Sequence, residues 1–129
     1  MLNDKQRYYG KTKVLNLEDL KNTFTSKKFD YLSIVLLFGS RVLGTYHDRS
    51  DYDFAICYEK EESVGWGMLS KVWVDVGEAF KLDEVDYDVI DLSSLTSEMK
   101  QSIINGYIVL KGSEDDISRV FGEHKASRR

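Results

Sequence analysis

An α/β domain, in which helices flank one small mixed β-sheet, is the fold that the sequence predicts. Three segments rich in β-branched and aromatic residues, 31–38, 52–58 and 85–92, have the composition of strands. Segments with helical spacing of apolar residues, 67–80 and 94–105, follow the second and third of these. Strands that alternate with helices along the chain indicate an α/β architecture around one sheet.

The composition excludes several classes of protein. The 129 residues, 42% of them hydrophobic, are enough for one core, so we expect a single domain over residues 1–129. A formal charge of −4 does not favour bulk binding of nucleic acid, which needs a basic surplus. Cys57 is the one cysteine, so disulfide frameworks and cysteine zinc sites are excluded. The longest apolar run, Ile34–Phe38, is far shorter than the roughly 20 residues that cross a membrane, and we expect a soluble cytoplasmic protein.

The first elements follow from caps and patterning. A helix is expected to begin at Asn16, whose side chain can accept hydrogen bonds from the free amides of the first turn. Its apolar face is expected to contain Leu17, Leu20 and Phe24. The next segment, 31–38, is apolar enough to be a buried strand.

The remaining elements are expected in the order strand, helix, strand, helix, extension and helix. Residues 52–58 alternate between two faces, as a strand does. The later elements are a helix at 67–80, a strand at 85–92, a helix at 94–105, an extended segment at 107–110 and a short helix capped by Ser113.

A glycine–serine pair directly follows the first strand. Gly39 allows the backbone to approach an anion closely, and the Ser40 hydroxyl and adjacent amides can donate hydrogen bonds to phosphate oxygens. This pair is therefore a candidate phosphate-binding turn.

Two carboxylates stand at the start of the second strand. On a regular strand Asp51 and Asp53 leave the same face, roughly 7 Å apart. Hard oxygen ligands of this kind suit Mg²⁺. Because the apolar segment Phe54–Cys57 follows, charged groups at this position need a cationic partner. A phosphate-binding turn beside a pair of metal ligands is what nucleotidyl transfer requires.

The spacing of these residues resembles that of a known family. Gly39-Ser40-Arg41, with Gly44 after it, precedes Ser50-Asp51-Tyr52-Asp53, and ten residues separate Ser40 from Asp51. The pattern resembles the minimal nucleotidyltransferases of the DNA polymerase β superfamily. The resemblance covers most of the chain and implies a nucleotidyltransferase fold similar to the polymerase β palm.

The resemblance implies two groups of site residues. The group that binds the triphosphate of ATP would be Gly39, Ser40 and Arg41. The catalytic group, which would also hold Mg²⁺ in a two-metal site, would be Asp51, Asp53 and Asp88.

The third carboxylate has more than one candidate. Asp88 fits the family's pattern of an aspartate, two apolar residues, any residue and leucine. Asp86 would share its strand face and stays an alternative. Asp91 would point the other way, and we expect it on the surface or leading into a helix.

Minimal members of this family are typically antitoxins of small helical HEPN-type RNase toxins. The resemblance implies that this chain transfers AMP from ATP to a hydroxyl of such a toxin and forms a complex with it. One alternative is a non-catalytic antitoxin that neutralises its partner by binding alone. A less favoured one is adenylylation of a small molecule, because related aminoglycoside-modifying enzymes carry an added helical domain. The acceptor, the base preference and the oligomeric state do not follow from the sequence.

Overall fold

The computed structural model describes residues 14–39, 42, 51–60, 67–83 and 85–121. In chain order its elements are α2 (Leu17–Phe24), the 3₁₀ turn η1 (Lys27–Phe29), β1 (Leu32–Phe38), β2 (Tyr52–Tyr58), α4 (Met68–Phe80), β3 (Tyr87–Asp91), the 3₁₀ turn η3 (Leu92–Ser94), α5 (Ser97–Ile104), β4 (Tyr107–Lys111) and α6 (Glu114–Val120). No helix in this part of the chain is long and apolar enough to cross a membrane. The predicted α/β class is confirmed.

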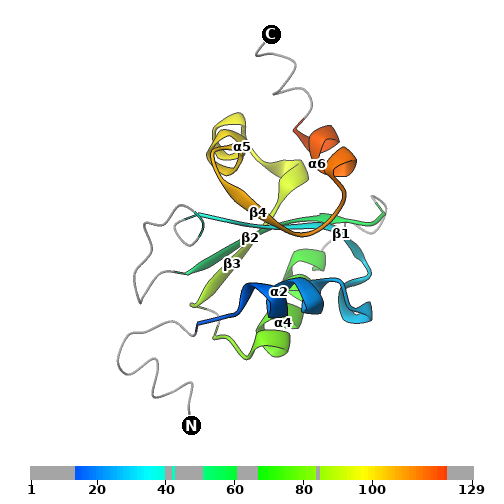
Figure 1. Cartoon of the computed structure of the whole chain (residues 1–129), viewed down its shortest axis with the longest axis vertical. Helices are drawn as coiled ribbons and strands as arrows, with labels where there is room; N and C mark the ends of the chain where they lie inside the picture. The colour runs from blue at the N-terminus through cyan, green and yellow to red at the C-terminus, as the bar shows by residue number, and fades with distance from the viewer. Residues whose placement is uncertain (1–13, 40–41, 43–50, 61–66, 84, 122–129) are drawn as a thin grey trace.

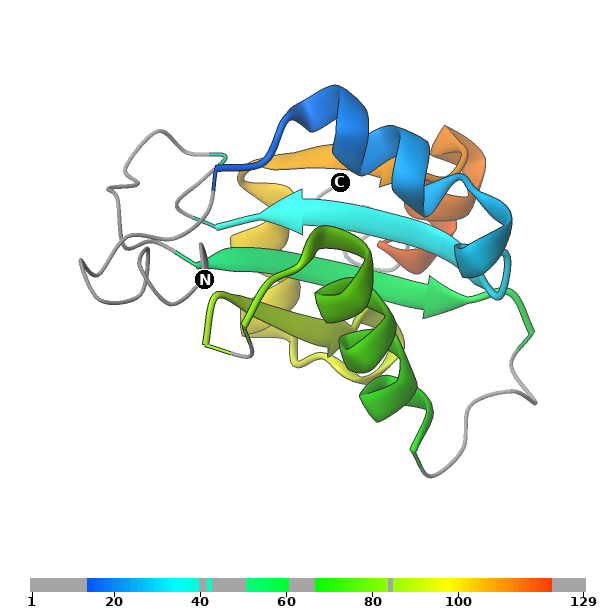
Figure 2. The ribbon, with the colours of Figure 1, turned by 90° about the horizontal axis from the view of Figure 1, so that it is seen from below.

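The four strands form one mixed sheet in the order β3-β2-β1-β4. β1 is antiparallel to β2 and to β4, whereas β2 and β3 are parallel. The end of β1 therefore lies at the same edge of the sheet as the beginnings of the other three strands (Figure 2). We refer to it below as the acidic edge, because the positions of Asp51, Asp53 and Asp88 lie there.

Helices cover both faces of the sheet (Figure 1). α2 and α4 pack on one face over a core that contains Phe24, Phe29, Phe54 and Phe80. η3, α5 and α6 cover the other face over a second core with Leu36, Ala55, Leu92, Ile103, Ile117 and Phe121. Because both faces are buried, β1 is apolar on both sides, as its continuous apolar sequence predicted.

The predicted caps are confirmed, but one face assignment is wrong. The Asn16 side chain accepts hydrogen bonds from the amides of Glu18 and Asp19, and helix α2 begins directly after it. Leu20 is buried as expected, whereas Leu17 is 40% exposed. Leu17 has suitable helical spacing, but it lies in the first turn, at the rim of the core.

Two element boundaries differ from the prediction because side chains form local turns. β3 begins at Tyr87 and not at residue 85, since the Asp86 carboxylate accepts a hydrogen bond from the Asp83 amide at 3.1 Å and closes a turn there. α5 begins at Ser97 and not at residue 94. The Asp91 carboxylate caps η3 first, accepting from the Ser93 amide at 2.9 Å, so its predicted helix-leading role is confirmed.

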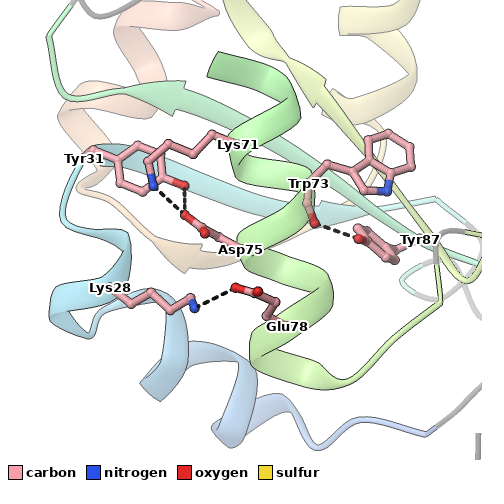
Figure 3. A network of polar contacts seen from close by, with 7 residues as sticks. All are labelled: Lys28, Tyr31, Lys71, Trp73, Asp75, Glu78 and Tyr87. Carbon is pink, nitrogen blue, oxygen red and sulfur yellow. Dashed lines mark hydrogen bonds and ion pairs between the residues drawn. The ribbon is translucent and has the colours of Figure 1, made fainter. Parts of the chain in front are cut away.

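A polar network joins the segment before β1 to helix α4 (Figure 3). The Tyr31 hydroxyl donates to Asp75 at 2.7 Å, and Lys71 reaches the same carboxylate at 2.9 Å. Burial and the hydrogen bond to Asp75 raise the pKa of Tyr31 above its usual value. Lys28 and Glu78 form a further, exposed pair at 3.5 Å. Because Tyr31 lies directly before β1, this network is at the opposite edge of the sheet from the end of β1.

The aromatic cluster under α2 predicts a large effect of one substitution. Phe24 is fully buried, with its ring centroid 4.9 Å from Phe29 and 5.4 Å from both Phe54 and Phe80. Phe24→Ala should lower the free energy of unfolding by about 3–5 kcal/mol. Leu17→Ala, on the same helix, should cost about 1 kcal/mol or less, because that side chain is partly exposed. Urea unfolding followed by circular dichroism measures both, and equal losses would contradict the assignment of the core.

Candidate active site

The predicted carboxylates meet at the acidic edge of the sheet. In the antiparallel pairing of β1 with β2, Phe38 lies opposite Asp53. In the parallel pairing of β2 with β3, Asp53 lies opposite Asp88. Strand alternation places both carboxylates on the α5/α6 side of the sheet, because Ala55 and Ile90, two residues further along each strand, belong to that core. Neighbouring strands lie about 5 Å apart, so the two side chains are direct cross-strand neighbours.

The electrostatics of Asp53 show that these acids share one environment. Asp53 is half-buried, whereas Asp88 and Asp51 are exposed. Burial, followed by the negative charges of Asp88 and Asp51, raises the pKa of Asp53 from 3.8 to about 6. A negative potential therefore develops around Asp53, and a cation bound there would relieve it.

Gly39 brings the turn after β1 directly onto Asp53. Its backbone has a φ of +85°, in the left-handed region that favours glycine. A Cβ atom at this position would collide with Oδ2 of Asp53 and lie 3.2 Å from its Cγ. The Val42 amide donates to the Gly39 carbonyl at 3.0 Å, which shows that the chain turns here. The predicted phosphate-binding turn thus begins against the carboxylate, while Ser40 and Arg41 lie outside the described residues.

Asp51 directly precedes β2, which begins at Tyr52 as predicted. Its negative charge acts on Asp53, so the two carboxylates lie near each other. Tyr52, between Asp51 and Asp53, is held by two hydrogen bonds. The Tyr52 amide donates to the Asp86 carbonyl at 3.0 Å, and its buried hydroxyl accepts from the Leu15 amide at 2.9 Å.

The geometry favours Asp88 over Asp86 as the third carboxylate. Asp86 uses its carboxylate to close the turn before β3, and its backbone carbonyl holds β2. Asp88 lies opposite Asp53 and is exposed to approaching molecules. The anchoring residues Tyr52 and Asp86 were not recognised as such from the sequence. The spacing of Asp83 and Asp86, typical of a side-chain-closed turn, was the signal available for the second.

The chemistry of the donors fits Mg²⁺, although the site is not assembled in advance. Among the described residues, no three His, Cys, Asp or Glu side chains are arranged as a ready metal site. Asp53 and Asp88 nevertheless offer hard oxygen donors in a negative potential, which is what Mg²⁺ requires. Burial and the negative charges of Asp91 and Asp116 raise the pKa of the Cys57 thiol to about 11, so the thiol is protonated at neutral pH.

Residues 18–116 match the family described as polymerase beta, nucleotidyltransferase. The chain belongs to this family. The match includes Asp51, Asp53, Asp86 and Asp88 at the acidic edge, together with Gly39.

The match to one individual relative covers a shorter part of the chain than the family match does. The chain is 32% identical over 71 residues to the protein adenylyltransferase MntA of Aphanizomenon flos-aquae (strain 2012/KM1/D3). That match covers 51% of this chain and 47% of the relative, so it spans about half the length of each.

Solved structures share the fold at low sequence identity. A crystal structure of a toxin–antitoxin with AMP-PNP superposes with a TM-score of 0.67 and 21% identity, over 88% of this chain and 87% of the other. A structure of tri-AMPylated Shewanella oneidensis HEPN toxin in complex with MNT antitoxin gives a TM-score of 0.58 and 17% identity, over 88% and 90%. These likenesses confirm the nucleotidyltransferase fold predicted from the sequence.

The contact between Gly39 and Asp53 predicts a specific sensitivity. Gly39→Ala adds a Cβ that has no room beside the Asp53 carboxylate. It also places an alanine at a positive φ, which is unfavourable for residues other than glycine. Gly67→Ala is the matched control, because Gly67 has a φ of +88° but no atom within 4 Å of its added Cβ. We expect Gly67→Ala to lower the free energy of unfolding by about 1–2 kcal/mol, and Gly39→Ala to lower it by roughly a further 1–3 kcal/mol. Denaturant unfolding measures both, and equal losses would show that the contact is absent.

The raised pKa of Asp53 predicts a pH-dependent stability. The folded protein holds this proton up to about pH 6, whereas the unfolded chain releases it near 3.8, so stability falls as the pH rises through this window. Asp53→Asn carries no charge and should raise the Tm relative to the parent protein above pH 6, with little effect below pH 4. Thermal unfolding in EDTA at both ends of the window tests this. Glu59→Gln, at an exposed position after β2, is the control, and an Asp53→Asn effect independent of pH would refute the charge assignment.

Proposed function

We propose that this protein transfers AMP from ATP to a hydroxyl group of a protein partner. The observation that carries the proposal is the cross-strand pair Asp53 and Asp88 beside the Gly39 turn, in a chain of the polymerase beta nucleotidyltransferase family. The relative named protein adenylyltransferase MntA supports AMP as the transferred group and a protein as the acceptor. The proposed catalytic unit is a single domain over residues 1–129 that works in the cytoplasm.

The proposed partner is a HEPN-type toxin, which this chain would neutralise as an antitoxin. The support comes from solved proteins of the same fold: one is a toxin–antitoxin with AMP-PNP, and another contains an AMPylated HEPN toxin bound to its MNT antitoxin. Both alignments extend over 87% or more of the neighbour. The proposal is therefore a complex in which the bound toxin is also the acceptor of AMP.

In the proposed reaction the acceptor hydroxyl oxygen attacks the α-phosphorus of ATP. The bond from that phosphorus to the oxygen bridging the α- and β-phosphates breaks, and pyrophosphate leaves with the electron pair. Asp88, which is exposed opposite Asp53, would accept the hydroxyl proton. The acceptor would approach at the edge of the sheet where this carboxylate is exposed, while α2 and α4 cover one face of the sheet (Figure 2) and η3, α5 and α6 cover the other.

The nucleotide would be held at the Gly39 turn. Gly39 would let the backbone approach the β- and γ-phosphates, with Ser40 donating from its hydroxyl and Arg41 assisting. Because Gly39 contacts Asp53, a triphosphate bound at this turn would lie beside the carboxylates.

Asp51, Asp53 and Asp88 would hold Mg²⁺ in this site. The bound metal would neutralise the negative charge that develops on the phosphates during transfer. The negative potential around Asp53 supports metal binding, and the exposed position of Asp51 would let its side chain adjust to the ion. The three carboxylates would thus come together as ligands when the ion and the triphosphate bind.

A non-catalytic antitoxin is the second candidate. The support for it is that an MNT antitoxin of the same fold is found in a complex with a HEPN toxin. In that case the protein would neutralise its partner by contact alone, and the carboxylates would not be needed for protection.

Mass spectrometry separates the two candidates. We expect a co-expressed HEPN-type partner, incubated with this protein, ATP and Mg²⁺, to gain the mass of AMP units. The variant with both Asp51→Asn and Asp53→Asn should reduce the initial rate by at least about a hundredfold, because Mg²⁺ and the phosphates lose two charged ligands. EDTA should abolish the transfer.

The controls address folding and binding. Asp115→Asn plus Glu114→Gln removes two exposed carboxylates from the first turn of α6 and should leave the rate unchanged. Size-exclusion chromatography should show that the double aspartate variant still forms the complex. If that variant protected cells from the toxin as fully as the parent protein, neutralisation by binding alone would be the correct function.

A further inference from the structure

The residue before Asp88 is locked into helix α4. Tyr87 is 5% exposed, and its hydroxyl donates to the backbone carbonyl of Trp73 at 2.6 Å (Figure 3). Its ring also packs on the Trp73 indole, with centroids 5.2 Å apart. The carbonyl lies in the middle of α4, where a regular helix already uses it to accept from the amide four residues later, at Gly77. The tyrosine hydroxyl therefore lies against the helix backbone itself.

Gly77 provides the space for this hydroxyl. A Cβ atom at position 77 would lie 2.5 Å from the Tyr87 hydroxyl oxygen, too close for any side chain. Gly77 does not have a positive φ, so a glycine is not needed there for an unusual backbone conformation. Glycine inside a helix weakens the helix relative to alanine. The contact with Tyr87 is therefore the physical reason for a glycine at this place.

We propose that Tyr87 is a positioning residue that fixes Asp88 opposite Asp53. The Tyr87 hydroxyl attaches the first residue of β3 to α4. The preceding residue, Asp86, is attached to β2, because its backbone carbonyl accepts from the Tyr52 amide. With Asp86 and Tyr87 fixed, the parallel register in which Asp53 faces Asp88 is held at the acidic edge. The inference rests on the proposed function only for the role of Asp88, because the lock itself is a property of the fold.

The chain contains a matched control for this lock. Tyr31 also donates its hydroxyl to α4, to the Asp75 carboxylate at 2.7 Å, but it lies before β1 at the opposite edge of the sheet (Figure 3). Tyr31→Phe and Tyr87→Phe each remove one tyrosine hydroxyl that bonds to α4. Only the second should disturb the carboxylates.

The first measurement tests the lock. Gly77→Ala should lower the Tm by about 3 °C or more in the parent protein, because the new Cβ meets the hydroxyl. In the Tyr87→Phe background the same change should raise the Tm, since the obstructing oxygen is gone and alanine favours the helix. If Gly77→Ala had the same sign in both backgrounds, the lock would be refuted.

The second measurement tests positioning in the metal-free protein. Hydrogen exchange of the Tyr52 amide reports on the attachment of β3, because this amide donates to the Asp86 carbonyl. Tyr87→Phe should speed its exchange about tenfold relative to amides of the β1–β4 pairing, and Tyr31→Phe should not. If both variants gave the same Tyr52 rate, the hydroxyl would have only a general stabilising role and the proposal would fail.

The third measurement connects the lock to the site. Calorimetric titration with Mn²⁺ should give a Kd at least about threefold higher for Tyr87→Phe than for the parent protein, with Tyr31→Phe unchanged. An unchanged Kd for Tyr87→Phe would overturn the positioning of Asp88. If the parent protein bound no Mn²⁺ and transferred no AMP, the proposed function would fail, while the exchange result would still decide whether Tyr87 fixes β3.

Discussion

The parallel pairing of β2 with β3 is the constraint on which the candidate site depends. Asp53 and Asp88 are 35 positions apart in the chain, and only this register makes them neighbours. The antiparallel pairing of β1 with β2 then brings the turn at Gly39 to the same edge. A shift of β3 by one residue would turn Asp88 into the α2/α4 core and bring an apolar neighbour to face Asp53, because side chains alternate along a strand. The arrangement of the site thus depends on the register of the strands more than on any single loop.

Local signals explain how much of the fold could be predicted. Asn16 and Ser113 cap their helices as their side chains suggested, since capping involves only residues within one turn. The errors occurred where tertiary position or side-chain turns decide. Leu17 has the right spacing but lies at the rim of the core, and the start of β3 was displaced by the turn that Asp86 closes. The pairing order of the sheet depends on contacts between distant segments, which periodicity along one segment does not contain.

The candidate site was predictable in its residue types and less so in its geometry. The sequence pattern identified Gly39, Asp51, Asp53 and Asp88, and the structure brings the described members of this group to one edge. The choice between Asp86 and Asp88 needed the observation that one carboxylate closes a turn while the other faces Asp53. The role of Tyr87 could not be predicted from the sequence, because its contact with Gly77 joins two elements that are separate in the sequence.

The packing around β2 holds Asp53 in an electrostatically unfavourable position at the acidic edge. Asp53 is half-buried next to two other carboxylates, an arrangement that opposes folding when no cation is present, as the raised pKa indicates. The strand that carries it is buried on both faces immediately afterwards, so the apolar contacts of Phe54, Ala55 and Ile56 hold the acid in place against this repulsion. Such a strained group persists only when its surroundings determine its position more strongly than its own charge does. A divalent cation held as proposed above would offset this repulsion, and the stability lost at the carboxylates would then be recovered when the cation binds.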